Sequence, residues 1–167
     1  MMSRRKFLGS TAVAGALAAA GAALRGASAE ASESRTFEVT KTKAEWKELL
    51  TPEQYYVLRE HGTERPGSSP LNKEKRQGAF RCAGCDLALF SSDTKYESGT
   101  GWPSFYAPLD NAVGTSEDSS FFMTRTEVHC RRCGGHLGHV FDDGPPPTGK
   151  RYCMNGVAMI FGPGDAA

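Results

Sequence analysis

The sequence predicts a mainly β domain with antiparallel strands, preceded by a short helical part. Two helix-start signals lie close together, at Thr42 and Thr51. After Gly78 the chain changes to short apolar or alternating runs that glycine, proline, aspartate and asparagine interrupt. A helical first third followed by many short strands is typical of an antiparallel, mainly β domain.

The two expected helices each begin at a capping box, Thr42–Glu45 and Thr51–Gln54. In this motif the threonine side chain and the third following residue each accept a free backbone N–H, and the proline after Thr51 suits a first helical turn. The first helix would place Trp46, Leu49 and Leu50 on one side.

Short runs after these helices are expected to be loops and strands. Gly62 would end the second helix, and the polar residues 63–77 would form an extended loop. The expected strands are Phe80, Leu87 to Phe90, Phe121 to Met123, Thr124 to Cys130, Leu137 to Phe141 and Val157 to Phe161. The proline-rich residues 144–149 are expected to form a surface turn.

Four of the five cysteines form two Cys-x-x-Cys knuckles, Cys82/Cys85 and Cys130/Cys133. Two knuckles supply the four thiolates of a tetrahedral zinc site. Two disulfides are the alternative in an oxidising compartment, but each would close a very small loop and stabilise little. Zinc is therefore preferred, and the fold must bring the two distant knuckles together.

Cys153 is the one cysteine left over, two residues after Arg151 and two before Asn155. A thiol reacts as its thiolate, and a nearby guanidinium favours the charged form. On a strand these three side chains would share one face. Burial as a small hydrophobic residue is the alternative for a free cysteine, but the polar neighbours favour a nucleophile.

Residues 1–29 have the features of a Tat signal peptide. Arg4 and Arg5 form a twin-arginine pair, a run rich in alanine and glycine extends from Gly9 to Leu24, and Ala27-Ser28-Ala29 is a small-residue cleavage site. The run is too short and too rich in small residues to be a convincing membrane span, although an uncleaved anchor is the alternative. We therefore expect Tat export to the periplasm or another extracytoplasmic space, without stable membrane insertion.

The rest of the chain fits one domain, with a flexible tail at 30–41, the domain at 42–161 and a C-terminal tail at 162–167. Four of the 20 basic residues precede residue 30, which leaves 16 against 19 acidic residues. This balance and the lack of a basic cluster in the sequence argue against a nucleic-acid partner.

Six blocks of sequence follow one another within residues 38–161. They are Cys82-x-x-Cys85, Ser98-Gly99-Thr100-Gly101-Trp102-Pro103-Ser104-Phe105, Arg125-Thr126-Glu127-Val128, Cys130-x-x-Cys133-Gly134, His136-Leu137-Gly138-His139-Val140-Phe141-Asp142-Asp143-Gly144-Pro145 and Arg151-Tyr152-Cys153-x-Asn155. Each block alone is a weak signal, but six in one order are very specific. In this respect the chain resembles the B-type peptide-methionine (R)-sulfoxide reductases.

The resemblance implies two antiparallel sheets in a compact, barrel-like domain with short N-terminal helices, braced by one structural zinc. It also implies thiol-dependent reduction of methionine R-sulfoxide to methionine, a repair reaction during oxidative stress. The partners would be oxidised proteins or peptides that contain methionine sulfoxide, with a thioredoxin-like protein or a small thiol as reductant. We expect the domain to act as a monomer.

His136 and His139 are the candidate proton donors. On a regular strand they would face opposite sides, so both can line one site only if the chain turns or bulges between them, which Gly138 permits. Histidine titrates near neutrality, so either can protonate the sulfoxide oxygen. By resemblance His139 is the direct donor. Completion of a Cys/His metal site is the alternative, although four cysteines already fill the shell of zinc.

The other candidate site residues are assigned around Cys153. Cys153 would attack the sulfoxide sulfur and pass through a sulfenic acid. Arg151 would stabilise the thiolate, and Asn155 would hold the oxygen or an ordered water. Trp102 would provide a flat apolar wall for the substrate methyl group, completed by Phe141. A plain core position is the alternative for Trp102.

Thr100 departs from the family pattern. Many members carry at this position, just before Gly-Trp-Pro, a resolving cysteine that attacks the sulfenic acid. Because the other four cysteines are assigned to zinc, the reaction would proceed without a conventional resolving cysteine. A second hypothesis is a zinc-stabilised module that binds oxidised or unmodified proteins without turnover. Such a module would tolerate serine in place of Cys153, whereas an enzyme would not.

Overall fold

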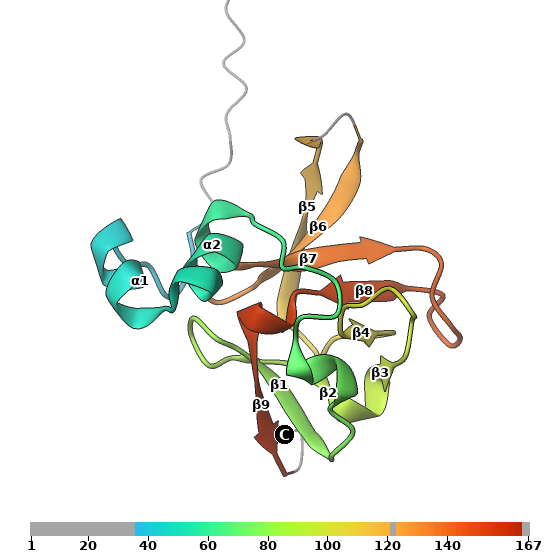
Figure 1. The fold of residues 1–167 in the computed structure, drawn as a ribbon. Coiled ribbons are helices and arrows are strands. Elements are labelled where there is room, and N and C mark those ends of the chain that lie inside the picture. Colours follow the sequence, from blue (N-terminus) through green and yellow to red (C-terminus); the bar gives the residue numbers. More distant parts are fainter. Residues whose placement is uncertain (1–35, 121–122, 165–167) are drawn as a thin grey trace, which may run out of the picture. The chain divides into compact units, whose positions relative to one another are not determined.

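The computed structural model describes residues 36–120 and 123–164 (Figure 1). The predicted signal peptide, residues 30–35 of the predicted tail and residues 121–122 of a predicted strand lie outside the described residues, so Tat export stays a prediction. In the described part of the chain, no helix combines the length and the apolar character that a membrane span requires.

Residues 36–41, the remainder of the predicted tail, contact the domain. The Val39 N–H donates to the Arg132 carbonyl at 3.0 Å, and Glu38 forms an ion pair with Arg131. These contacts attach the segment to the turn that carries the second cysteine knuckle.

Both helices begin at the predicted capping boxes. Helix α1 spans Lys43–Leu49 and α2 spans Pro52–Glu60, and both reciprocal hydrogen bonds of each box are present. Trp46 and Leu50 are buried as expected, whereas Leu49 is 54% exposed. Leu49 therefore does not share the buried side of Trp46 and Leu50.

The end of α2 differs from the sequence-based expectation. The helix ends at Glu60, and His61 rather than Gly62 adopts the left-handed conformation, with a φ of 55°. Gly62 is needed for a different reason, because a Cβ atom there would lie 2.2 Å from the Tyr56 ring. The glycine therefore allows the chain to leave the helix in close contact with Tyr56.

The strands form two antiparallel sheets, as predicted (Figure 1). In the three-stranded sheet, β1 (Gly78–Cys82) lies between β2 (Ala88–Ser91) and β9 (Met159–Pro163). The six-stranded sheet has the order β3-β4-β8-β7-β6-β5. Its strands are β3 (Lys95–Tyr96), β4 (Ser104–Phe105), β5 (Val113–Asp118), β6 (Arg125–Cys130), β7 (His136–Phe141) and β8 (Arg151–Met154). Neither sheet closes on itself, so the barrel-like domain that was expected is not a closed barrel.

Several segments differ from the predicted strands and loops. The predicted strand Val157 to Phe161 begins as the 3-10 turn η4 (Gly156–Ala158), and β9 continues through Pro163 into the predicted C-terminal tail. Met123 is not in a strand. The predicted loop 63–77 contains a 3-10 turn, η1 (Pro70–Lys73). A second such turn, η2 (Ser92–Thr94), follows β2. Residues 144–149 form a turn, as expected.

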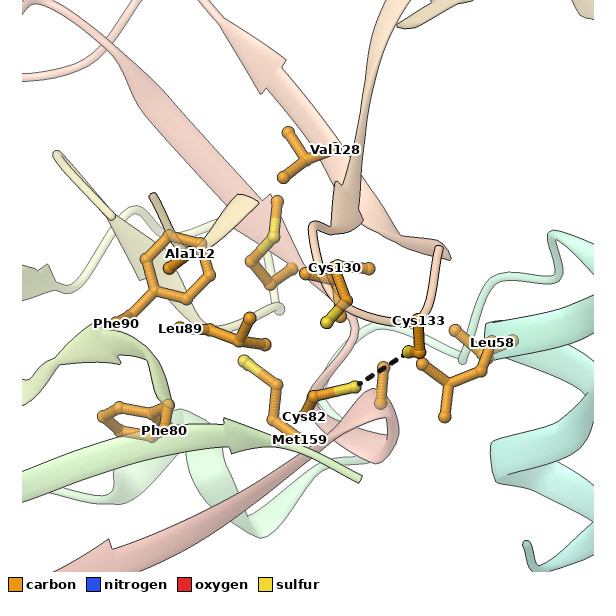
Figure 2. Close-up of a cluster of buried hydrophobic side chains, with 14 of the residues drawn as sticks. Leu58, Phe80, Cys82, Leu89, Phe90, Ala112, Val128, Cys130, Cys133 and Met159 are labelled. Carbon is orange, nitrogen blue, oxygen red and sulfur yellow. Dashed lines mark hydrogen bonds between the residues drawn. The ribbon is translucent and has the colours of Figure 1, made fainter. Parts of the chain in front are cut away.

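The core lies where the two sheets meet. Phe80 of β1 packs edge-on against Phe105 of β4, with ring centroids 4.9 Å apart, and Phe90 of β2 stacks on Phe105 at 4.4 Å. All three rings are fully buried. Figure 2 shows Phe80 and Phe90 near Leu89, and it shows three of the knuckle cysteines, Cys82, Cys130 and Cys133, next to this cluster. This packing fixes β4 and, through its pairing with β8, the strand that carries Cys153.

Candidate active site

Cys153 lies on β8 between two partner strands. It pairs with His139 of β7 on one side and with Ser104 of β4 on the other. Residues directly opposite each other in antiparallel strands project to the same face. The register therefore brings the partly buried Cys153 thiol and the His139 imidazole to one face of the sheet.

A bulge in β7 brings both histidines to one side. In the pairing of β6 with β7, His129 lies opposite His136 and the adjacent Val128 lies opposite Gly138. Leu137 is therefore the extra residue of a β-bulge and has no partner on β6. The rings of His136 and His139 consequently lie with their centroids 5.3 Å apart. Gly138 is required here, because a Cβ atom would lie 2.2 Å from the Cys153 carbonyl oxygen. The bulge meets the condition for both histidines to lie on one side, although only His139, and not His136, shares a hollow with Cys153.

A carboxylate on the neighbouring hairpin orients His139. His139 Nε2 lies 2.6 Å from Asp118 Oδ2 at the end of β5, and Arg125 Nη2 donates to the same oxygen at 2.8 Å. Hydrogen bonds, first from Ser120 and then from His139, hold the pKa of Asp118 well below its usual range. Burial lowers the pKa of His139, and the hydrogen bond to Asp118 opposes that shift. Asp118 is therefore an anion that fixes the His139 ring.

His136 lies behind His139 and contacts a different carboxylate. It is 2% exposed, and its Nδ1 lies 2.8 Å from Glu127 Oε1, while His61 Nδ1 lies 3.1 Å from the same oxygen. Burial acts to raise the pKa of Glu127, but hydrogen bonds from His136, His61 and Ser116 outweigh it and keep that pKa well below its ordinary value. The ionised Glu127 therefore fixes the orientation of His136.

One small hollow, of about 120 Å³, contains most of the predicted site residues. Its lining residues are Thr63, Trp102, Arg125, Gly138, His139, Phe141, Cys153 and Asn155. The Trp102 indole N–H donates to the Glu64 carbonyl at 3.2 Å, which fixes the indole beside the thiol. A hollow of this size accommodates the end of one side chain, because pockets for drug-sized ligands are several times larger.

Arg151 does not line the hollow. Its guanidinium makes two hydrogen bonds of 2.8 Å to the Asp143 carboxylate and lies 4.3 Å from the centre of the Phe141 ring. The bond to Asp143 raises the pKa of Arg151, and the Cys153 thiol contributes in the same direction. Arg151 is thus a cation near Cys153 that is already paired with the Asp143 carboxylate. The negative charge of Asp143 weakens the stabilisation that Arg151 can give to a Cys153 thiolate.

Asn155 connects the hollow to two other segments. Its side-chain N–H donates to the Leu137 carbonyl at 2.9 Å, and its Oδ1 accepts the Glu64 backbone N–H at 2.9 Å. The Glu64 carboxylate in turn accepts the backbone N–H groups of Gly156 and Val157 at 2.6 and 3.0 Å. Asn155 therefore holds the backbone around the hollow, and its contact with the sulfoxide oxygen or an ordered water stays a prediction.

A hydroxyl group lies next to the Cys153 thiol. Thr100 Oγ1 is 3.7 Å from Cys153 Sγ, and it is 2.9 Å from Ser98 Oγ. Ser98 Oγ also lies 2.7 Å from Ser104 Oγ. The position where many family members carry a resolving cysteine is therefore within contact distance of Cys153, but it holds a hydroxyl.

The four knuckle cysteines gather into one cluster, as predicted. All four sulfurs lie within 4.8 Å of one another. Cys82 Sγ is 3.7 Å from Cys133 Sγ (Figure 2), and Cys85 Sγ is 3.4 Å from Cys130 Sγ. Metal–thiolate bonds of about 2.3 Å in a tetrahedron separate the sulfurs by about 3.8 Å, whereas a disulfide requires about 2.0 Å. The cluster can hold a metal ion, contains no disulfide, and is complete without the histidines of β7.

The sequence reasoning missed the three carboxylates around the hollow: Glu64, Asp118 and Glu127. Glu127 belongs to a recognised block, which was the one signal for it, because its neighbours Thr126 and His129 are polar and the local pattern does not single it out. Asp118 lies at the end of a strand that was not predicted, so no local signal identified it.

Comparison with known proteins identifies the family. The SelR domain model matches residues 50–163. The peptide methionine sulfoxide reductase MsrB of Agrobacterium fabrum is 57% identical over 127 residues, which cover 75% of this chain and 94% of that protein. The chain belongs to the MsrB family.

Other MsrB relatives show the same extent of similarity. The MsrB protein of Methanosarcina barkeri is 60% identical over 124 residues, or 74% of this chain and 87% of that protein. The MsrB protein of Pseudomonas putida W619 is 56% identical over 131 residues, or 78% of this chain and 98% of that protein. The residues matched by the family model include every residue of the hollow and all four knuckle cysteines.

Proposed function

We propose that this MsrB-family protein reduces the R epimer of methionine sulfoxide in oxidised proteins to methionine. Family membership supports the activity. The observation that carries the assignment to particular residues is the single hollow lined by the Cys153 thiol, the His139 imidazole and the Trp102 indole. It offers a nucleophile, a proton donor and an apolar wall around the end of one side chain.

In this proposal the oxygen atom moves from the substrate to the enzyme. The Cys153 thiolate attacks the sulfoxide sulfur and forms an S–S bond, while His139 protonates the oxygen as the S–O bond breaks. The released oxygen then adds to the Cys153 sulfur as hydroxide, and the S–S bond breaks with its electron pair left on the methionine sulfur. The substrate sulfur gains two electrons, the Cys153 sulfur loses two, and the oxygen ends on Cys153 as a sulfenic acid. One proton leaves the thiol and one enters on the oxygen, so the step is balanced. Trp102 and Phe141 would contact the substrate methyl group.

The His139–Asp118 pair gives the proposal a pH dependence. The donor is protonated His139, and burial lowers its pKa from 6.5. The reduction step should therefore slow as the pH rises through that lowered pKa. Asp118→Asn removes an interaction that raises the pKa, so the falling limb should move to lower pH and the rate at pH 7 should fall roughly tenfold or more. The measurement is the single-turnover rate of methionine formation as a function of pH.

Glu117→Gln is the matched control, because Glu117 precedes Asp118 on β5 and contacts Ser119 rather than His139. Its profile should coincide with that of the wild type. An Asp118→Asn profile that also coincides with the wild type would show that Asp118 does not act on the proton donor.

We propose that the four-cysteine cluster holds one structural zinc. Four thiolates in a closed, largely buried tetrahedral arrangement are typical ligands of structural zinc, and they leave no coordination position open for substrate. The ion would join the β1–β2 turn to the turn after β6. It would therefore stabilise the domain and take no part in the reaction.

Thr100 determines how the enzyme would be recycled. With a hydroxyl 3.7 Å from Cys153 Sγ, the sulfenic acid has no thiol at this position to attack it. We expect an external thiol, from a small molecule or a thioredoxin-like protein, to form a mixed disulfide with Cys153 that a second thiol resolves. If residues 1–29 direct export, that reductant must operate outside the cytoplasm.

Mass spectrometry after one turnover tests this recycling. Wild-type protein should carry Cys153 as a sulfenic acid that dimedone traps, without an intramolecular disulfide. Thr100→Cys should form a disulfide with Cys153, because the two side chains are already in contact, whereas Thr100→Ser should not. A wild-type disulfide between Cys153 and a knuckle cysteine would contradict both the recycling scheme and the zinc assignment.

A further inference from the structure

A second and much larger hollow borders the first. This groove, called here the β9 groove, has a volume of about 1000 Å³ and is lined by α2, the chain from Thr63 to Ser69, η1, η4 and β9. Its apolar lining residues include Tyr56, Val57, Leu71, Val157, Ile160 and Phe161. Tyr56 and Ile160 are 51% and 50% exposed. Charged residues, among them Glu53, Glu74 and Arg76, also line it. A surface groove of this size with a largely apolar lining is typical of a binding site.

One thin wall separates the β9 groove from the hollow around Cys153. Thr63 is exposed and lines both. Below it, Glu64 accepts the N–H groups of Gly156 and Val157, and its own N–H donates to Asn155. Because an exposed residue lines both hollows, a bound chain can pass over Thr63 from one into the other.

The β9 groove also reaches a free strand edge. Strand β9 pairs with β1 on one side and is the edge of its sheet. Consecutive side chains of a strand point to opposite faces, yet Met159, Ile160 and Phe161 all line the groove. The groove must therefore run along the edge of β9, where backbone groups can pair with an added strand.

We propose that the β9 groove binds the extended stretch of client polypeptide that flanks an oxidised methionine. This inference rests on the proposed function: a hollow of about 120 Å³ can take the sulfoxide side chain only, so the rest of a protein substrate must lie outside it. Methionine is an apolar residue found mostly in protein interiors, so its neighbours are commonly apolar. Backbone pairing along β9 would accept them with little dependence on sequence.

The test compares a substrate that can fill the groove with one that cannot. Ile160→Glu on β9 and Tyr56→Glu on α2 change opposite walls of the groove. Each should lower kcat/KM for hydrogen-peroxide-oxidised β-casein, an unfolded protein, roughly fivefold, because about 1 kcal/mol of apolar contact is lost. Turnover of free methionine-R-sulfoxide should be unchanged, which also shows that the variants fold. Leu49→Glu is the control, since Leu49 is equally exposed but lies outside the groove.

The outcomes separate the possibilities. If the two groove variants keep full activity on oxidised casein, or lose activity equally on both substrates, the inference is wrong. If Ile160→Glu instead changes the oligomeric state or the protease sensitivity of residues 1–34 while casein turnover is unchanged, the groove holds a second copy or the chain's own N-terminal segment. Failure of the wild type to reduce either substrate would contradict the proposed function itself.

Discussion

Replacement of Cys153 by serine is expected to abolish reduction of methionine-R-sulfoxide, by roughly 10³-fold or more in kcat. Serine keeps the size and the hydrogen bonding of the side chain, but its hydroxyl is a far weaker nucleophile and cannot accept the oxygen as a sulfenic acid. The measurement is methionine formation with dithiothreitol as reductant, together with the thermal midpoint of the variant.

The fold should be unaffected, because Cys153 lies outside the four-cysteine cluster. The Cys153→Ser protein should therefore contain as much zinc as the wild type and unfold at nearly the same temperature. A folded serine variant that still reduced the sulfoxide would remove Cys153 from the mechanism. Retained binding of oxidised protein without turnover, in both the wild type and the variant, would instead support a binding module.

Replacement of one knuckle cysteine by serine is expected to unfold much of the domain. Wild-type protein should contain one zinc per chain, and Cys82→Ser or Cys133→Ser should lose it. Structural zinc sites contribute about 10–16 kcal/mol of apparent binding energy in zinc-finger peptides, and that energy is coupled to folding. Native proteins are generally stable by only about 5–15 kcal/mol, so loss of even part of this contribution should lower the thermal midpoint strongly.

Cys82 and Cys133 belong to different knuckles and are 0% and 3% exposed, so the two variants test both halves of the cluster. Elemental analysis and thermal unfolding measure the result, and Cys153→Ser is the matched control. Wild-type protein without stoichiometric zinc, in which mass spectrometry finds two disulfides among the knuckle cysteines, would refute the assignment.

The local signals in the sequence predicted the helices well. Both capping boxes depend on contacts between residues three apart, such as Thr42 with Glu45, so a short stretch of sequence contains all the information needed. The exit from α2 was harder to predict. His61 takes the left-handed conformation there, and its side chain contacts Glu127 and His136, which are tertiary partners that propensity does not describe.

The expected strands include all or part of β1, β2, β6, β7 and β9, but not β3, β4, β5 or β8. Strand β7 has a strong apolar pattern, whereas β5 is largely polar and β3 and β4 have two residues each. Such short or polar strands are stabilised by their neighbours in the sheet. The sequence also did not indicate that the sheets stay open, because closure depends on whether the distant edges of a sheet meet.

The residues of the candidate site were recognisable as motifs, but their contacts were not. The Cys153, His139 and Trp102 motifs do meet in one hollow. The Asp118–His139 and Glu127–His136 contacts depend on the register of β5, β6 and β7 and on the bulge at Leu137. Likewise, the two backbone contacts of Asn155 join segments that lie far apart in the sequence.

The central claim is that the hollow between β7 and β8 reduces one epimer of methionine sulfoxide through Cys153. Its most direct test is turnover of the two separated epimers by the purified domain without residues 1–29, with a chemical thiol as reductant. We expect methionine to form from the R epimer only. A nucleophile, a proton donor and an apolar wall in fixed positions distinguish the two configurations at the sulfoxide sulfur. Equal turnover of the S epimer, or no turnover of the R epimer, would contradict the account.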